Sequence, residues 1–142
     1  MARRSSSLQF EDLPGGTSGG PGSKRDMSKS LMSYRKDGYA VFYPTQDQID
    51  KLGNYVKVQL MRESGQVVGS HLKRSSRDES GSIVLRTTVD TERPNYPIPM
   101  KRVGRIRIAQ DAMRREEVQT EVDAAGLRVW FPDGWTVMET VR

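Results

Sequence analysis

The side chains of this sequence that are best suited to chemistry are basic residues at short spacings. Four of them, Lys101, Arg102, Arg105 and Arg107, lie within seven residues of one another. On an extended strand Arg105 and Arg107 project from one face, at a spacing close to that of successive phosphates. Lysine and arginine neutralise phosphates whatever the base sequence. This pattern therefore predicts a contact with nucleic acid.

Further basic groups extend the prediction to other parts of the chain. Lys73 and Arg74 belong to a charged, serine-rich loop, and Arg114 and Arg115 form a third patch. The alternative for the strand arginines is a solvated face beside nearby glutamates. The residues that we predict to bind nucleic acid are Arg3, Arg4, Lys24, Arg25, Lys73, Arg74, Lys101, Arg102, Arg105 and Arg107.

Signals for catalysis, cofactors or metals are weak. His71 is the only histidine, and no recognisable nucleophile or orienting partner accompanies it, so we expect a surface or core-edge strand residue. The acidic pairs lack the ligand periodicity of a calcium loop. The glycine run before Lys24 is not a phosphate-binding loop, because Ser23 separates the lysine from Gly22. We predict no catalytic set, cofactor or metal.

Composition narrows the class of protein. The chain has 142 residues, a formal net charge of +5 and no cysteine. This length suits one domain with one core. The positive charge favours nucleic acid or an acidic membrane surface as partner. The lack of cysteine excludes disulfides and favours a reducing intracellular compartment, the cytoplasm or nucleus of a host cell. No apolar run approaches the ~20 residues of a transmembrane helix.

The first 37 residues have the composition of a disordered, basic arm. Residues 14–25 are rich in glycine, serine and proline. Such a segment loses much backbone entropy on folding and has little to bury. A short apolar cluster within it, Leu8, Phe10 and Leu13, could order on a partner. We predict an arm over residues 1–37 and a single β-rich domain over residues 38–142.

Alternating apolar residues predict several short strands in that domain. They cover residues 39–43, 55–62, 66–72, 83–89 and 103–108, and the second and third of these form a hairpin. Thr45 and Gln48 have the spacing of a capping box and predict a short helix. Residues 109–125 fit a helix followed by a strand, or one helix that ends at Gly126.

The C-terminal stretch is predicted to be the core hairpin of the domain. Both tryptophans and one of three phenylalanines fall between residues 130 and 135. The Pro-Asp-Gly sequence at residues 132–134 fits a type I turn whose glycine takes the left-handed bulge position. The side chains that then share one face are those of Leu127, Val129, Phe131, Trp135 and Val137.

These patterns predict a mainly β fold, with α+β as the alternative. We expect a small antiparallel β-sandwich or partly open barrel with one or two short helices behind the N-terminal arm. A basic arm before a β-domain without a catalytic set indicates a non-enzymatic, self-associating structural protein of a virion, such as a coat, matrix or head–tail component, that contacts nucleic acid or nucleoprotein. The alternatives are a nucleic-acid-binding regulator that forms no shell, and an adaptor or enzyme subunit.

Overall fold

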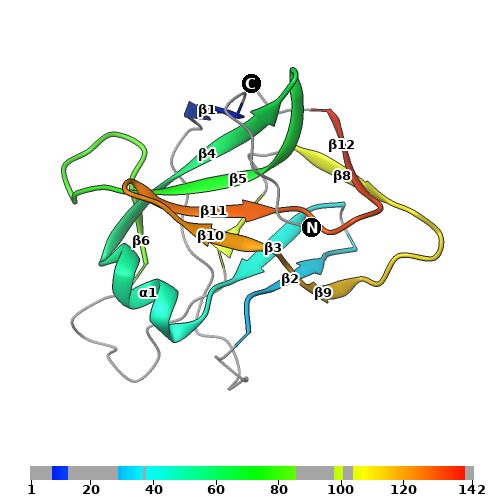
Figure 1. Cartoon of the computed structure of the whole chain (residues 1–142), viewed down its shortest axis with the longest axis horizontal. Helices are drawn as coiled ribbons and strands as arrows, with labels where there is room; N and C mark the ends of the chain where they lie inside the picture. The colour runs from blue at the N-terminus through cyan, green and yellow to red at the C-terminus, as the bar shows by residue number, and fades with distance from the viewer. Residues whose placement is uncertain (1–7, 13–28, 37, 86–97, 101–103, 140–142) are drawn as a thin grey trace.

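The computed structural model describes residues 8–12, 29–36, 38–85, 98–100 and 104–139. They form antiparallel strands and one short helix, which confirms the predicted fold class (Figure 1). The elements in chain order are β1 (Leu8–Asp12), β2 (Leu31–Tyr34), β3 (Ala40–Tyr43), α1 (Gln46–Leu52), β4 (Tyr55–Glu63), β5 (Gln66–Arg74), β6 (Ile83–Val84), β7 (Ile98–Pro99), β8 (Arg105–Ile108), β9 (Arg115–Glu117), β10 (Thr120–Val122), β11 (Gly126–Trp130) and β12 (Trp135–Glu139).

The described strands are arranged in three sheets that do not close into a barrel. The first has the order β1-β4-β5-β11-β10, and β6 also pairs with β4. The second has the order β7-β3-β2-β9, and the third consists of β8 and β12. The chain passes from the second sheet to the first through residues 118–119, between β9 and β10. Figure 1 shows the third sheet at the right, at the end of the molecule away from α1.

One hydrophobic core receives side chains from all three sheets and from α1. Alternation along β4 decides which side chains enter it: Val56, Val58 and Leu60 are buried there, while Lys57 and Gln59 lie on the opposite face. Burial of each large apolar side chain contributes roughly 1.5–3 kcal/mol. This core fixes the relative positions of the sheets.

The helix α1 begins as its sequence predicts. Gln48 donates its backbone N–H to Thr45 Oγ1 at 3.1 Å, and Thr45 donates its own N–H to Gln48 Oε1 at 2.9 Å. These two bonds form the predicted capping box. Ile49 and Leu52 are buried on the inner face of the helix, which ends at Gly53.

The predicted hairpin between β4 and β5 is confirmed, as are strands at β3 and β8. The strand predicted over residues 83–89 is found as the short β6, and residues 86–89 lie outside the described ranges. Thus the strands with clear alternation form, while their ends depend on pairing partners.

The prediction of a C-terminal hairpin is wrong, although its turn and buried face are right. Trp135 N–H donates to Pro132 O at 3.1 Å, and Gly134 has a φ of +86°. However, β11 pairs with β5 and β10, whereas β12 pairs with β8. The turn therefore connects two sheets. The side chains predicted to share a face are buried or pack against the core: Leu127, Val129, Phe131, Trp135 and Val137.

Neither helix predicted for residues 109–125 is present. The segment contains a turn, closed by Ala112 N–H donating to Ala109 O at 3.0 Å, followed by β9 and β10. The strand expected after the first of those helices is confirmed for Thr120–Val122. Pairing of β9 with β2 and of β10 with β11 overrides the local helical tendency.

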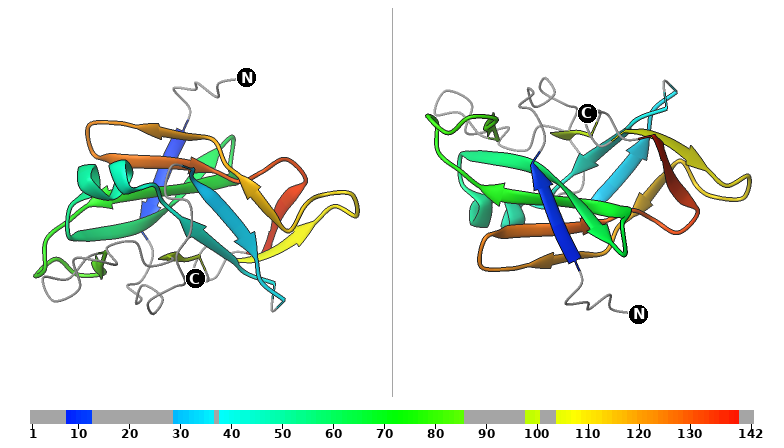
Figure 2. Two further views of the ribbon diagram at one scale, coloured as in Figure 1. Left: turned by 90° about the horizontal axis from the view of Figure 1, so that it is seen from below. Right: turned by 90° about the horizontal axis from the view of Figure 1, so that it is seen from above.

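Two strands lie inside the range assigned to the N-terminal arm, so the predicted boundary at residue 38 differs from the structure. β2 is an internal strand of the second sheet, and β1 pairs with β4. Figure 2 (right) shows β1 lying across β4 and β5, and the Phe10 ring stacks on the His71 ring with centroids 4.4 Å apart. Residues 1–7 and 13–28 of the predicted arm lie outside the described ranges.

Candidate functional site

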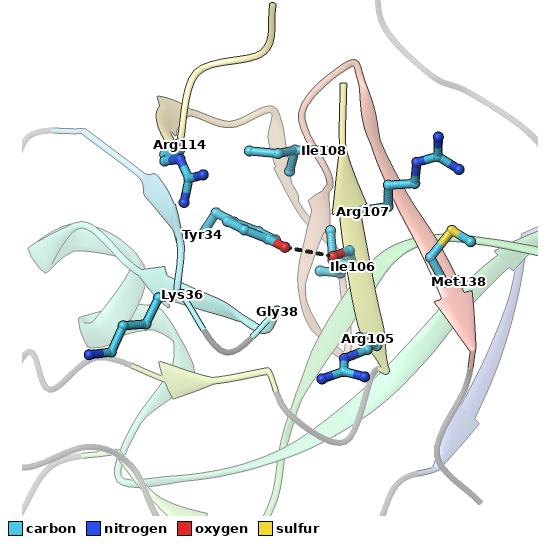
Figure 3. Close-up of a pocket in the computed structure, with 9 residues that line it drawn as sticks. All are labelled: Tyr34, Lys36, Gly38, Arg105, Ile106, Arg107, Ile108, Arg114 and Met138. Atoms are coloured by element: carbon cyan, nitrogen blue, oxygen red, sulfur yellow. Dashed lines mark hydrogen bonds between the residues drawn. The ribbon is translucent and has the colours of Figure 1, made fainter. Parts of the chain in front are cut away.

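A hollow of about 480 Å³ lies where the second sheet meets the third (Figure 3). We call it the basic hollow, because its lining contains four cationic side chains and no carboxylate among the described residues. The residues that line it are Tyr34, Lys36, Gly38, Arg105, Ile106, Arg107, Ile108, Arg114 and Met138.

Strand alternation places two of the arginines at this site. Ile106 is 2% exposed and anchors β8 in the core, so Arg105 and Arg107 on either side of it are exposed. Figure 3 shows Arg105 near Gly38, while Arg107 extends on the β12 side of β8, beside Met138. The Arg105 guanidinium therefore lies at the Gly38 end of the hollow, and the Arg107 guanidinium lies on the side of β8 away from Tyr34.

The turn after β2 lies close to the Arg105 side chain. Gly38 has a φ of +90°, a left-handed conformation that favours glycine. A Cβ at this position would lie 3.3 Å from Cγ and Nε of Arg105. In addition, Ile106 N–H donates to Gly38 O at 2.8 Å. The absence of a side chain at residue 38 thus lets β8 and its arginine approach the turn closely.

Tyr34 is the floor of the basic hollow and joins the two sheets. Its hydroxyl donates to Ile106 O at 3.0 Å, and its ring meets that of Trp135 edge to face at 5.8 Å. The Arg114 guanidinium lies over the Tyr34 ring, 5.5 Å from its centroid. Trp135 Nε1 donates in turn to Met113 O at 3.2 Å, which fixes the segment that carries Arg114.

The cations of the hollow are available to an anion. Among the side chains that the structure describes, no salt bridge involves Lys36, Arg105 or Arg107. All three are exposed, and their like charges repel one another. A polyanion that enters the hollow relieves this repulsion and gains charge-assisted hydrogen bonds from the arginines.

The structure brings together only part of the predicted set of basic residues. Arg105 and Arg107 line the hollow, while Lys73 and Arg74 lie at the far end of β5, on the left of Figure 1. Arg74 is held there by a hydrogen bond to Ala124 O. The remaining predicted residues lie outside the described ranges: Arg3, Arg4, Lys24, Arg25, Lys101 and Arg102.

Two lining cations were not assigned to this site by sequence reasoning. Arg114 was recognised as basic but placed in a separate patch, and Lys36 was counted with the arm. Their proximity is hidden in the sequence, because Arg114 is about 80 residues from Tyr34 and Lys36 along the chain. In the structure the Tyr34 N–H donates to Arg114 O at 2.6 Å across the sheet. Only the pairing of β2 with the segment leading into β9 reveals the shared site.

His71 belongs to a different polar cluster, on the face of the first sheet opposite the core. It is buried, being only 2% exposed, and is not at the surface or the core edge as predicted. Its Nδ1 lies 2.8 Å from Gln59 Oε1, and its Nε2 lies 3.0 Å from Asp123 Oδ2. Phe10 of β1 stacks over the ring.

The His71 cluster has the features of a structural network. Burial lowers the pKa of His71, although the Asp123 carboxylate opposes this effect. The same carboxylate accepts the backbone N–H of Gly126 at 2.7 Å and Nε of Arg128 at 2.9 Å. It therefore closes the turn between β10 and β11 as well as orienting the histidine.

In the described ranges, no group of three or more acidic or histidine side chains is arranged to hold a metal ion. No helix among these residues is long and apolar enough to cross a membrane. No protein-family model, curated protein or solved structure matched the chain.

Proposed function

We propose that this chain is a non-enzymatic, self-associating structural protein that contacts nucleic acid through the basic hollow. The observation that carries the proposal is that Lys36, Arg105, Arg107 and Arg114 all line one hollow that has no carboxylate among its described lining residues. Such groups bind phosphates by charge and by counterion release. We further propose that the protein is a component of a virion, as its architecture suggests.

The expected contact is with the nucleic-acid backbone. Tyr34, the aromatic residue of the hollow, already uses its hydroxyl, one edge and one ring face within the protein. It is therefore poorly placed to stack on a base, which is the usual basis of single-strand binding by aromatic residues. Contacts to phosphate position a nucleic acid without reading its sequence. Binding should consequently be salt-dependent and weakly selective.

Self-association is supported by the open edges of the described sheets. β9 is the last strand in its sheet, and β8 and β12 have only each other as partners. Exposed strand edges carry unpaired backbone groups that readily add a strand from another chain.

The direct test measures RNA affinity over a range of salt concentrations. Each phosphate contact contributes roughly 0.7–0.9 to the slope of log affinity against log salt. The triple variant R105Q/R107Q/R114Q should therefore lower the slope by about two units if all three arginines contact phosphate. Fluorescence anisotropy with a labelled mixed-sequence RNA oligonucleotide provides the measurement, and a second oligonucleotide of different sequence should respond equally.

A matched control removes the same charge from the other end of the molecule. The variant K73Q/R74Q/R77Q should keep most of the wild-type slope, because Lys73 and Arg74 are the last residues of β5 and Arg77 follows them, at the end of the strand away from the hollow. Equal loss in both variants would show that only net charge matters. No binding by wild type at low salt would refute the nucleic-acid contact, and binding by a chain that stays monomeric would favour the regulator instead.

A further inference from the structure

The outer edge of β9 has backbone groups that face away from β2. Arg114 C=O accepts a backbone N–H of β2 at 2.6 Å, and Val118 N–H donates to the residue before β2 at 3.0 Å. Successive residues of a strand direct their hydrogen-bonding groups to opposite edges. The N–H and C=O groups of Arg115 and Glu117 therefore point outward, where the described residues supply no further strand.

This edge is open because β11 turns away before it reaches β9. Trp130 N–H still donates to Gln119 O at 3.0 Å, which continues the pairing of β11 with β10. The next residue, Phe131, donates its N–H to Val68 O at 3.0 Å instead, on the β5 side. Pro132 follows and has no N–H to donate. On the N-terminal side of Gln119, where β9 lies, the chain therefore no longer pairs with β11.

A hollow of about 430 Å³ occupies the resulting gap, and its rim is acidic. Glu116, Glu117 and Asp133 line it together with Phe131 and Trp130. Neither Glu116 nor Glu117 forms a salt bridge within the described residues. We call this site, the hollow with the outer edge of β9, the acidic groove.

Two features of the groove define the ligand that it fits. The outer edge of β9 offers backbone groups to an added strand, and Glu116 and Glu117 give the rim negative charge. Open backbone groups and an acidic rim together match an extended, basic peptide segment.

We propose that the acidic groove binds residues 1–7 of a second copy of this chain as an added strand. This segment reads Met-Ala-Arg-Arg-Ser-Ser-Ser, with two arginines, no acidic residue and no proline. Its backbone can therefore pair along the whole edge, and Arg3 and Arg4 complement the glutamates of the rim. The inference deepens the self-association in the proposed function and rests on it.

The segment of the same copy is badly placed to reach the groove. β1 belongs to the first sheet, where its Phe10 stacks on His71 of β5, whereas β9 is the edge strand of the second sheet. Arg4 lies four residues before Leu8, a reach of at most about 14 Å. Figure 2 likewise shows β1 and β9 apart in both views. The occupant is thus supplied by another molecule.

A charge-exchange experiment tests the proposal in full-length protein freed of nucleic acid. The variant E116K/E117K has a reversed groove, and the variant R3E/R4E has a reversed segment. Each alone should associate at least about tenfold more weakly than wild type. An equimolar mixture should regain association, because the acidic segment of one variant then fits the basic groove of the other, and the unchanged pair also fits. Size-exclusion chromatography with light scattering measures the masses.

The rescue on mixing also shows that both variants are folded, and E116Q/E117Q provides an intermediate, uncharged groove. A wild-type chain that is monomeric at every concentration, or a mixture that remains monomeric, would overturn the inference. A different measurement shows whether the nucleic-acid contact fails. An unchanged RNA salt slope in R105Q/R107Q/R114Q would refute that contact, and this variant leaves the acidic groove intact.

Discussion

Replacing Asp123 by asparagine should remove about 2 kcal/mol of stability at neutral pH, and the structure provides the reason. One carboxylate oxygen accepts backbone N–H groups of Ala125 and Gly126 at 2.9 and 2.7 Å. The other accepts Arg128 Nε at 2.9 Å and lies 3.0 Å from His71 Nε2. Asparagine keeps the size of the side chain and one acceptor oxygen, so the substitution mainly removes the negative charge.

The magnitude follows from the pKa of this carboxyl group. Burial raises the pKa of Asp123, but the hydrogen bonds from Arg128, His71 and Gly126 outweigh burial and lower the pKa from an ordinary 3.8 to about 2. One pKa unit corresponds to about 1.4 kcal/mol, so the shift of nearly two units corresponds to about 2.5 kcal/mol, and the partial exposure of the Asp123 side chain reduces this to about 2 kcal/mol. Because the folded-state pKa is depressed, this stabilisation is complete above the unfolded pKa and is lost as pH falls through the folded value.

Urea denaturation of wild type and Asp123→Asn over a series of pH values is the appropriate assay. The pKa of His71 is lowered chiefly by burial, so both proteins should lose stability below about pH 6.5. The Asp123 carboxylate opposes the lowering of the His71 pKa, so the variant should lose somewhat more of this stability, and the difference between the two proteins should widen slightly from about pH 6.5 to about pH 5. The difference should then close towards pH 2, as Asp123 becomes protonated in folded wild type. A difference independent of pH, or one near zero at neutral pH, would refute the reasoning.

Two further predictions concern the fold. Gly69→Ala should destabilise the protein by about 3 kcal/mol in urea denaturation, because the new Cβ would lie 2.0 Å from Val129 O. In the control Gly65→Ala the new Cβ meets open space, so this variant should lose only about 1 kcal/mol, for its left-handed φ. Equal losses in the two variants would contradict this packing. Deleting residues 2–33 should abolish cooperative thermal unfolding, because the deletion removes β1 and most of β2 with the fully buried Met32. Deleting residues 2–7 should shift the melting temperature by only a few degrees. A cooperative transition retained by the longer deletion would contradict a structural role for β2.

Local signals in the sequence were sufficient for elements whose partner is close in the chain. The capping box of Thr45 and Gln48 needs only a helical turn, and the β4–β5 hairpin needs only a turn at residues 64–65. The exposed arginines of β8 followed in the same way from alternation around Ile106. Each of these features is set by contacts within a few residues, which propensity and periodicity describe directly.

The errors share a different physical origin, because they involve the choice of a distant pairing partner. The turn at residues 132–134 formed as predicted, yet β12 pairs with β8 and not with β11. Residues 109–125 have helical propensity, yet β9 and β10 are strands because β2 and β11 offer open edges. Likewise, the segment over residues 8–12 is polar enough to be read as an arm, but β4 provides an edge for it.

The sequence by itself determined the class of fold, the identity of most core residues and the basic character of the chain, because composition and alternation specify which side chains avoid water. Tertiary structure alone decided which charges act together. Lys36 and Arg114 join Arg105 and Arg107 because backbone bonds link Tyr34 to Arg114 and Ile106 to Gly38, and because the Tyr34 hydroxyl donates to Ile106 O at 3.0 Å. It also decided that β11 leaves β9 unpaired and so creates the acidic groove. Strand pairing is a long-range choice, made by the backbone hydrogen bonds and core packing of the whole chain, which no local pattern encodes.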